Sequence, residues 1–283
     1  MTMQVAVIIP AAGSGTRFND AAVTLGGKSK IEQDLAGKPV FLRAIEIFLH
    51  NPRVAQIILA VNPGEISDFQ VRWGDKLAFH NVKIVPGGKK ERWETVLKAL
   101  ETVTDDCTHV AVHDAARPLA SAALVNRMFD AAARVDAVIP AVPVTATLKK
   151  VTTDDEAAGT QPADPLDAIF GNAGKPDMSP ARVLETIDRR DFVEVQTPQV
   201  FAVDLLRRAY ANLANAAETT LITDDAMLVE QLGETVWVVD GESTNVKITR
   251  PDDMKTAEAL ATVTEHEKSA GLGAKRLFAD NDD

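Results

Sequence analysis

Residues 5–30 read VAVIIPAAGSGTRFNDAAVTLGGKSK, and this stretch decides which fold we expect. It begins with the apolar run Val5–Pro10, passes through small residues and glycines, and ends in a cluster of cations. Apolar residues at consecutive positions are typical of a strand that is covered on both faces. Backbone amides in a glycine-rich turn bind anionic groups such as phosphates. The stretch therefore predicts a buried strand that leads into a nucleotide-binding loop, or else a structural turn with solvated cations.

Two well-known phosphate loops do not match this stretch. The dinucleotide motif G-x-G-x-x-G finds its first two glycines in Gly13 and Gly15, but Phe18 stands at the third position. A bulky side chain there would prevent the close approach of helix and strand that the motif needs. The P-loop motif G-x-x-x-x-G-K-[ST] fails as well, because Ala22–Ser29 starts with alanine and follows no strand. We therefore expect a loop of a third kind, with Arg17 and either Lys28 or Lys30 at the phosphates.

The rest of the chain alternates between short β-branched runs and amphipathic segments. The further strands that we predict are Gln56–Val61, Val82–Val85, Thr108–His113, Ala137–Val142 and Thr235–Val239. The predicted helices are Val40–Leu49, Arg92–Val103 and Leu124–Ala133. This alternation favours a Rossmann-like α/β fold of three layers, with a mostly parallel sheet between helices. Ligands bind such sheets at the carboxyl ends of the strands.

Composition sets limits on function and location. The chain has 283 residues, of which 46 % are hydrophobic and 25 % charged, as in ordinary globular proteins. Its net charge of −11 argues against nucleic-acid binding, which needs a basic surface. Cys107 is the single cysteine, so no internal disulfide can form and a cytoplasmic setting is expected. No apolar run approaches the roughly 18 residues of a membrane span, and no signal peptide is visible.

One segment interrupts the alternating pattern. Thr152–Pro180 is rich in acids and prolines and has few large apolar residues, so we expect a mobile excursion from the sheet. It is either a disordered insertion or part of a functional arm. We divide the chain into a single domain, 1–265, with 147–193 as an inserted arm, and a loose tail, 266–283. His109 and His113 lie about 13 Å apart if both are on a strand, too far to share one metal ion.

Further motifs narrow the interpretation. These are VAVHDAARP at 110–118, VQTPQVF at 195–201, ITDDAMLVE at 222–230 and TNVKITRPDD at 244–253. Together with the opening loop, they resemble the 2-C-methyl-D-erythritol 4-phosphate cytidylyltransferase family of nucleotidyltransferases over about Val5–Leu260. Ribitol-phosphate cytidylyltransferases share much of this series. The chain departs from the usual proline-lysine-glutamine after the arginine, because it reads Ser29-Lys30-Ile31, and Thr244 replaces a common acidic residue.

The resemblance implies that a phosphomonoester attacks the α-phosphorus of CTP and releases pyrophosphate. The attacking phosphate is mostly dianionic at neutral pH, so no general base is required. Cationic side chains and a divalent metal, Mg²⁺, must then stabilise the negative charge of the two reactants in the transition state. By resemblance, the catalytic residues are Arg17, Lys30, Arg189 and Lys247. The residues implied to bind the nucleotide are Pro10, Ala11, Ala12, Gly13, Gly15, Gly87, Gly88 and Thr95. Those implied to bind the polyol phosphate are Asp114, Arg117, Thr147 and Thr197, with Asp114 also a candidate metal ligand.

The resemblance also implies a homodimer, in which the arm crosses to a second subunit and Arg189 enters the partner's site. Lys28 and Lys30 compete for the role of the triphosphate lysine. Counting back from LAGKPV, residues 35–40, gives that role to Lys30. Two alternatives remain open: ribitol-5-phosphate as the substrate, or a nucleotide-binding regulator that has lost turnover.

Overall fold

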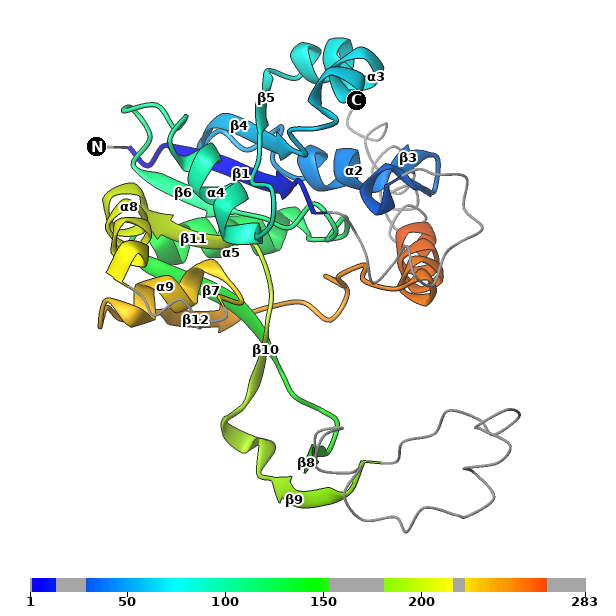
Figure 1. Ribbon diagram of the computed structural model, residues 1–283, viewed down its shortest axis with the longest axis vertical. Helices are drawn as coiled ribbons and strands as arrows, with labels where there is room; N and C mark the ends of the chain where they lie inside the picture. The colour runs from blue at the N-terminus through cyan, green and yellow to red at the C-terminus, as the bar shows by residue number, and fades with distance from the viewer. Residues whose placement is uncertain (1, 14–28, 153–180, 216–221, 264–283) are drawn as a thin grey trace, which may run out of the picture. The chain divides into compact units, whose positions relative to one another are not determined.

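The computed structural model describes residues 2–13, 29–152, 181–215 and 222–263 (Figure 1). Gly15, Arg17 and Lys28 lie outside these residues, as do 153–180 of the expected excursion and the whole predicted tail. The chain divides into two compact units, which we describe separately. The first unit comprises Met1–Val142 and Val195–Asp283, and the second comprises Pro143–Glu194.

The first unit is built on a mostly parallel sheet, as predicted. Its strand order is β7-β11-β6-β1-β4-β5, and β12 pairs in parallel with β7. The bounds are β1 (Val5–Ala11), β4 (Val54–Val61), β5 (Val82–Pro86), β6 (His109–Val112), β7 (Ala137–Pro143), β11 (Gln199–Ala202) and β12 (Trp237–Asp240). The strand β11 runs antiparallel to both neighbours, β6 and β7. A short separate ladder joins β2 (Asp34–Leu35) to β3 (Lys38–Pro39).

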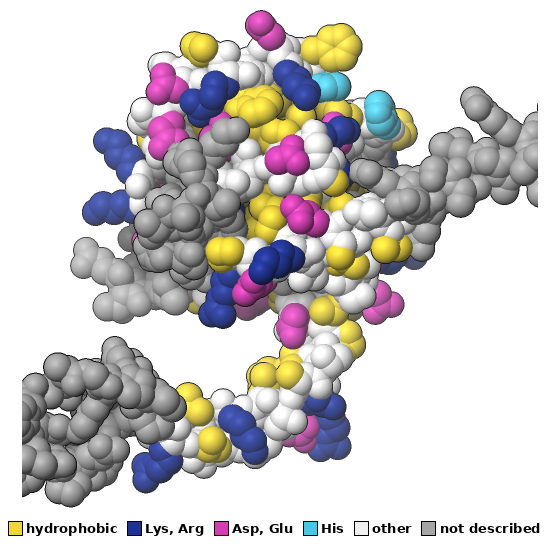
Figure 2. Space-filling view, turned by 90° about the vertical axis from the view of Figure 1, so that its right-hand side faces the viewer, with side chains coloured by type: hydrophobic (Ala, Val, Ile, Leu, Met, Phe, Trp, Pro, Cys, Tyr) yellow, Lys and Arg dark blue, Asp and Glu magenta, His cyan; other side chains and the backbone are white. Residues whose placement is uncertain are grey.

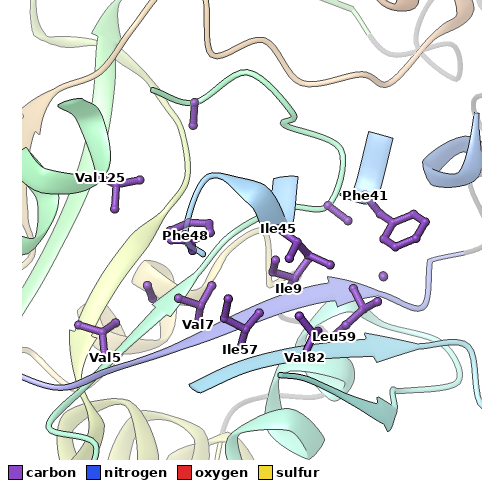
Figure 3. Packing of buried hydrophobic residues seen from close by; sticks show 14 of the residues in the cluster. Val5, Val7, Ile9, Phe41, Ile45, Phe48, Ile57, Leu59, Val82 and Val125 are labelled. Atoms are coloured by element: carbon purple, nitrogen blue, oxygen red, sulfur yellow. The ribbon is translucent and has the colours of Figure 1, made fainter. Parts of the chain in front are cut away.

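Helices cover both faces of this sheet, which explains the continuous apolar runs. Along β1, Val5, Val7 and Ile9 belong to one buried cluster, whereas Ala6 and Ile8 belong to the other. Figure 3 shows the first cluster, where β1 and β4 side chains meet Ile45 and Phe48. This face is covered by α2 (Val40–Glu46), α3 (Ile66–Phe79) and α5 (Ala122–Ala132). The opposite face is covered by α4 (Arg92–Leu100), α8 (Val203–Ala211) and α9 (Asp225–Gln231).

Side-chain caps fix where two of the helices begin. The Ser121 hydroxyl accepts the Leu124 N–H at 3.0 Å before α5, and the Asp224 carboxylate accepts the Met227 N–H at 3.1 Å before α9. Such caps satisfy amides that have no partner inside the helix. The 3₁₀ turns are η1 (Lys30–Glu32), η2 (Arg189–Asp191) and η3 (Asn212–Asn215), and residues 251–263 form a further helix. None of the described helices has both the length and the apolar character that crossing a lipid bilayer needs.

The second unit is small and consists mainly of one antiparallel ladder. β8 (Leu148–Val151) pairs with β9 (Val183–Ile187), and η2 and β10 (Val193–Val195) lead the chain back to the first unit. Several large apolar side chains of this unit are exposed, namely Val151, Val183, Leu184, Phe192 and Val193. An isolated two-stranded ladder is marginally stable in water, so this unit offers apolar surface without a core of its own.

Candidate active site

A pocket of about 350 Å³ lies in the first unit, where β1 and β6 end. Its wall includes the small residues that follow β1, namely Pro10, Ala11, Ala12 and Gly13. The other predicted site residues that line it are Lys30, Gly88, Thr95, Asp114 and Lys247. The structure thus brings together residues from five separate stretches of sequence at the carboxyl edge of the sheet, where α/β proteins bind their ligands.

The loop Gly87-Gly88 must be glycine because neighbouring atoms leave no room for side chains. A Cβ on Gly87 would lie 2.6 Å from the Ala12 Cβ, and one on Gly88 would lie 2.4 Å from the Glu94 Cβ. The Gly88 N–H donates to the buried Thr95 hydroxyl at 3.0 Å. The Glu94 carboxylate accepts the N–H groups of Lys89 and Lys90, and these bonds close the loop onto the start of α4. The loop therefore packs directly against the turn after β1.

Asp114 is the electrostatic centre of the pocket. Its carboxylate lies 2.7 Å from the Lys247 Nζ, 3.2 Å from the Arg92 Nε and 3.8 Å from the Arg117 Nε. Burial by itself would raise the pKa of Asp114, but the charges of Arg92, Lys247 and Arg117 outweigh it and hold the pKa well below its usual range. Asp114 is therefore ionised, and it fixes Lys247 and Arg92 at the pocket wall.

Arg92 has a place in the site that the sequence motifs did not reveal. Its Nη1 donates to the Asp225 Oδ2 at 2.7 Å, so the guanidinium bridges two carboxylates. Asp225 is buried and also accepts the Tyr210 hydroxyl. Burial alone would lower the pKa of Arg92, but Asp225 and Asp114 outweigh it and raise the pKa, so the group stays charged. Asp225 lies in the motif ITDDAMLVE, which indicated the family resemblance but did not suggest a role for this residue.

His113 and Thr197 form a buried support beneath Asp114. The His113 Nε2 lies 3.0 Å from the Arg117 carbonyl oxygen, so it must carry the proton and donate. Its Nδ1 then accepts from the Thr197 hydroxyl at 3.1 Å, and that hydroxyl accepts the Asp114 N–H at 3.1 Å. Burial lowers the pKa of His113 to about 4, which keeps the ring neutral. Thr197 therefore positions the Asp114 backbone.

Arg117 likewise acts on the backbone and does not line the pocket. Its guanidinium donates to the carbonyl oxygens of Asn245 at 2.7 Å and Val195 at 3.2 Å. The buried Asn245 side chain donates to the Thr197 carbonyl oxygen at 2.9 Å. These bonds join the TPQ and NVK segments, which are far apart in sequence, and so fix the position of Lys247.

The remaining predicted residues, Thr147 and Arg189, belong to the second unit, where both are exposed. Arg189 begins η2, and its Nη1 donates to the Thr145 carbonyl oxygen of the same unit. Their role in the site stays a prediction.

The donor set of the pocket bears on the expected Mg²⁺. The described residues contain no group of three His, Cys, Asp or Glu side chains that could hold a metal ion. Mg²⁺ in nucleotide sites is commonly held by one or two carboxylates together with substrate phosphates. Among the described residues, the pocket offers the Asp114 carboxylate to a Mg²⁺ ion that would arrive with a triphosphate, and it offers no larger set of ligands.

A mostly parallel α/β sheet, with a small-residue turn and cations at its carboxyl edge, places the chain in the class of α/β nucleotidyltransferases. The family model for IspD, 2-C-methyl-D-erythritol 4-phosphate cytidylyltransferase, matches residues 5–171 and 172–263. The chain belongs to this family.

Individual relatives agree with this assignment. The chain is 35 % identical to the 2-C-methyl-D-erythritol 4-phosphate cytidylyltransferase of Solibacter usitatus, over 90 % of this chain and 94 % of the relative. It is 38 % identical to the protein of the same name from Frankia casuarinae, over 91 % of this chain and 81 % of the relative. The crystal structure of the Thermus thermophilus protein of that name superposes with a TM-score of 0.64 at 29 % identity, covering 92 % of this chain and 100 % of that one.

Proposed function

We propose that this chain transfers the cytidylyl group of CTP to the phosphate of 2-C-methyl-D-erythritol 4-phosphate. An oxygen of the polyol phosphate forms a bond to the α-phosphorus, the bond from the α-phosphorus to the bridging oxygen breaks, and pyrophosphate leaves. The product is a CDP-polyol for the non-mevalonate isoprenoid pathway. The observation that carries the proposal is the Asp114 cluster, in which Lys247 and Arg92 stand at the wall of a pocket lined by the turn after β1.

Each part of the pocket has a proposed task. The amides after β1 and the Gly87-Gly88 loop hold the nucleotide, with the loop and Thr95 at the cytosine. Lys30 and Arg17 stabilise the triphosphate, and Lys247 orients the attacking phosphate. When bound, Mg²⁺ would supply further charge neutralisation at the triphosphate, and Asp114 is the residue that would meet it. Because both reactants are anions, positioning and cationic stabilisation account for the catalysis.

A general base is not part of this mechanism. The polyol phosphate is mostly dianionic at neutral pH. His113, the histidine nearest Asp114 in sequence, is fully buried and has both ring nitrogens hydrogen-bonded within the protein. It therefore supports the site and does not accept a proton from the substrate.

We also propose that the chain works as a homodimer in the cytoplasm. The second unit exposes apolar side chains on a two-stranded ladder, and contact with another subunit would cover them. Figure 2 shows lysines and arginines interspersed with acids over the face that it presents, which does not resemble a continuous basic surface for nucleic acid. Arg189 would act in the partner's site.

A single assay tests the function. The purified chain is incubated with Mg²⁺, CTP and either 2-C-methyl-D-erythritol 4-phosphate or ribitol 5-phosphate, and pyrophosphate release is measured. Reactions with ATP, GTP or UTP serve as controls for the nucleotide. We expect release with CTP and the methylerythritol phosphate. Faster release with ribitol 5-phosphate would favour the alternative substrate, and CTP binding without any release would favour the regulator.

A further inference from the structure

Lys30 lines the pocket from η1, a turn of only three residues. So short a turn depends on side-chain contacts as well as on its backbone hydrogen bonds. Within η1, the Glu32 N–H donates to the Ser29 carbonyl oxygen at 2.9 Å, and the Gln33 N–H donates to the Lys30 carbonyl oxygen at 3.4 Å. The 3.4 Å contact is long for an N–H···O bond, so η1 is weakly stabilised by its own backbone.

The Glu32 side chain connects this turn to α3. Its Oε1 accepts the Trp73 Nε1–H at 2.9 Å and the Arg72 Nε–H at 3.1 Å. Its Oε2 lies 3.3 Å from the Ser29 Oγ, which donates to it from the residue just before Lys30. Only 9 % of the Glu32 side chain is exposed, whereas 45 % of the Arg72 side chain is exposed. This shielded carboxylate thus ties the turn to α3, in addition to Ile31, which packs against the core, and the Gln33 carbonyl oxygen, which accepts the Val40 N–H at 3.1 Å.

Trp73, which donates to Glu32, is held in place by the aromatic core. The Trp73 ring packs edge-on against Phe41 of α2, with ring centroids 5.3 Å apart, and Phe41 contacts Phe69 of α3 at 5.3 Å. Phe41 and Phe69 belong to the buried cluster beneath the sheet. The indole therefore presents its N–H from a position that the core determines, which makes it a fixed reference point for η1.

We infer that Glu32 is a positioning residue, which holds η1 on Trp73 and Arg72 so that the Lys30 ammonium stays at the bound triphosphate. The kinetic part of this inference rests on the proposed function. Small displacements of a catalytic group cost large factors in rate, with about 1 Å worth roughly 100-fold. A cation that meets charge developing in the transition state affects turnover more than substrate binding.

The kinetic test compares matched variants in the pyrophosphate assay. We expect Glu32→Ala to lower kcat by about 10- to 100-fold, with KM for CTP changed far less. Glu32→Gln keeps the shape and an acceptor oxygen for Trp73 and should recover much of the loss. Trp73→Phe keeps the aromatic contact with Phe41 but removes the N–H donor, so kcat should fall several-fold. The control, Glu46→Ala, breaks the 2.8 Å ion pair with Lys38 outside η1 and should leave kcat unchanged.

Two further measurements separate this inference from the proposed function. In a Lys30→Ala background, Glu32→Ala should cause no additional loss of kcat, because its effect passes through that lysine. Hydrogen exchange of the Glu32 and Gln33 amides should quicken in Glu32→Ala and Trp73→Phe but not in Glu46→Ala, and this readout needs no activity. If the unaltered chain releases no pyrophosphate, the proposed function fails. Hydrogen exchange still tests whether Glu32 holds η1 on Trp73 and Arg72. Unchanged exchange in η1, or losses that multiply in the double variant, would overturn the inference.

Discussion

At the scale of single residues, the proposed mechanism depends on one ammonium group placed near the triphosphate. Lys30 lines the pocket and Lys28 lies outside the described residues, so the choice of Lys30 as the triphosphate lysine stays a prediction. We expect Lys30→Ala to lower kcat by about 100- to 1,000-fold, because preorganised donors at developing charge have effects of that size. Lys28→Ala is the matched control and should act mildly through screened charge. Steady-state assays at saturating CTP and Mg²⁺ check this, and a larger effect of Lys28→Ala would contradict it.

The buried histidine makes the fold sensitive to acid. Burial lowers the pKa of His113 from 6.5 to about 4, so near pH 5 the unfolded chain binds a proton that the folded chain does not. Stability therefore falls as the pH drops from about 7 towards 4. We expect the free energy of unfolding to decrease by about 2 kcal/mol between pH 7 and pH 5 from this group. Burial also lowers the pKa of His109, which adds in the same direction.

Denaturant titrations at several pH values measure this dependence. His113→Gln should flatten the slope between pH 7 and pH 5, even if it lowers stability at every pH. His50→Gln, at an exposed position, should keep the slope of the unaltered chain. A slope that His113→Gln leaves unchanged would show that other groups cause the acid sensitivity.

Some site residues could be predicted from sequence and others could not, for a physical reason. Asp114 and Lys247 stand in short motifs that follow strands or loops, so their residue types and positions already suggest a ligand site. Arg92 stands among other charged residues in KKERWE, where a solvated surface cation would give the same pattern. Its importance comes from Asp225, which is 133 positions away and reaches it only through the fold.

At the scale of elements, two glycines in helical and loop settings should respond to alanine in opposite ways. Gly88→Ala would place a Cβ 2.9 Å from the Thr95 backbone nitrogen and 2.4 Å from the Glu94 Cβ, so the loop must move. We expect it to lower the free energy of unfolding by about 1–3 kcal/mol and to weaken CTP binding. Gly74 lies inside α3, and apart from its chain neighbours and the adjacent helix backbone no atom lies within 4 Å of the position that an added Cβ would occupy. Gly74→Ala should therefore stabilise the fold by about 0.5–1 kcal/mol.

Chemical denaturation and CTP titration of the two glycine variants check this contrast. Gly74→Ala should leave CTP affinity unchanged, since Gly74 does not line the pocket. Equal effects of the two substitutions on stability would contradict the close packing of the Gly87-Gly88 loop.

The strands of the sheet could be predicted well because they are apolar at consecutive positions. The run predicted at Gln56–Val61 is found as Val54–Val61, and the predicted Val5–Pro10 is found as Val5–Ala11. The pattern predicts no helix over Ile66–Phe79, where only Phe69 and Leu77 are buried while Val71 and Phe79 are 87 % and 84 % exposed. Ile66, Phe69, Trp73 and Leu77 do share one face of this helix, but the exposed Val71 and Phe79 interrupt the apolar pattern in the sequence. The sequence did not predict strand β11, because it begins with the polar Gln199. This side chain is buried only because it meets Asp224 and Ala226 in the folded chain.

At the scale of the whole molecule, the main prediction concerns assembly. If Arg189 acts in the partner's site, each active site needs one arm from the other subunit. Mixing an inactive Arg189→Ala chain with an inactive Arg17→Ala chain should then restore part of the activity, because each mixed dimer contains one intact site. Pyrophosphate release after subunit exchange measures this, with each variant alone as the control. A chain that is monomeric at working concentration and fully active would contradict the proposal.

The point at which the second unit joins the first has a consequence for the length of the arm. The chain leaves the first unit after Val142 and re-enters it at Val195, and the Gln196 N–H closes the base of this excursion on the Pro140 carbonyl oxygen at 2.7 Å. The entropy of closing an excursion grows only with the logarithm of its length. Insertions beyond that closure are therefore nearly neutral for the nucleotide pocket. The arm can therefore be lengthened at little cost in folding free energy, provided that Arg189 can still serve the partner's site as proposed.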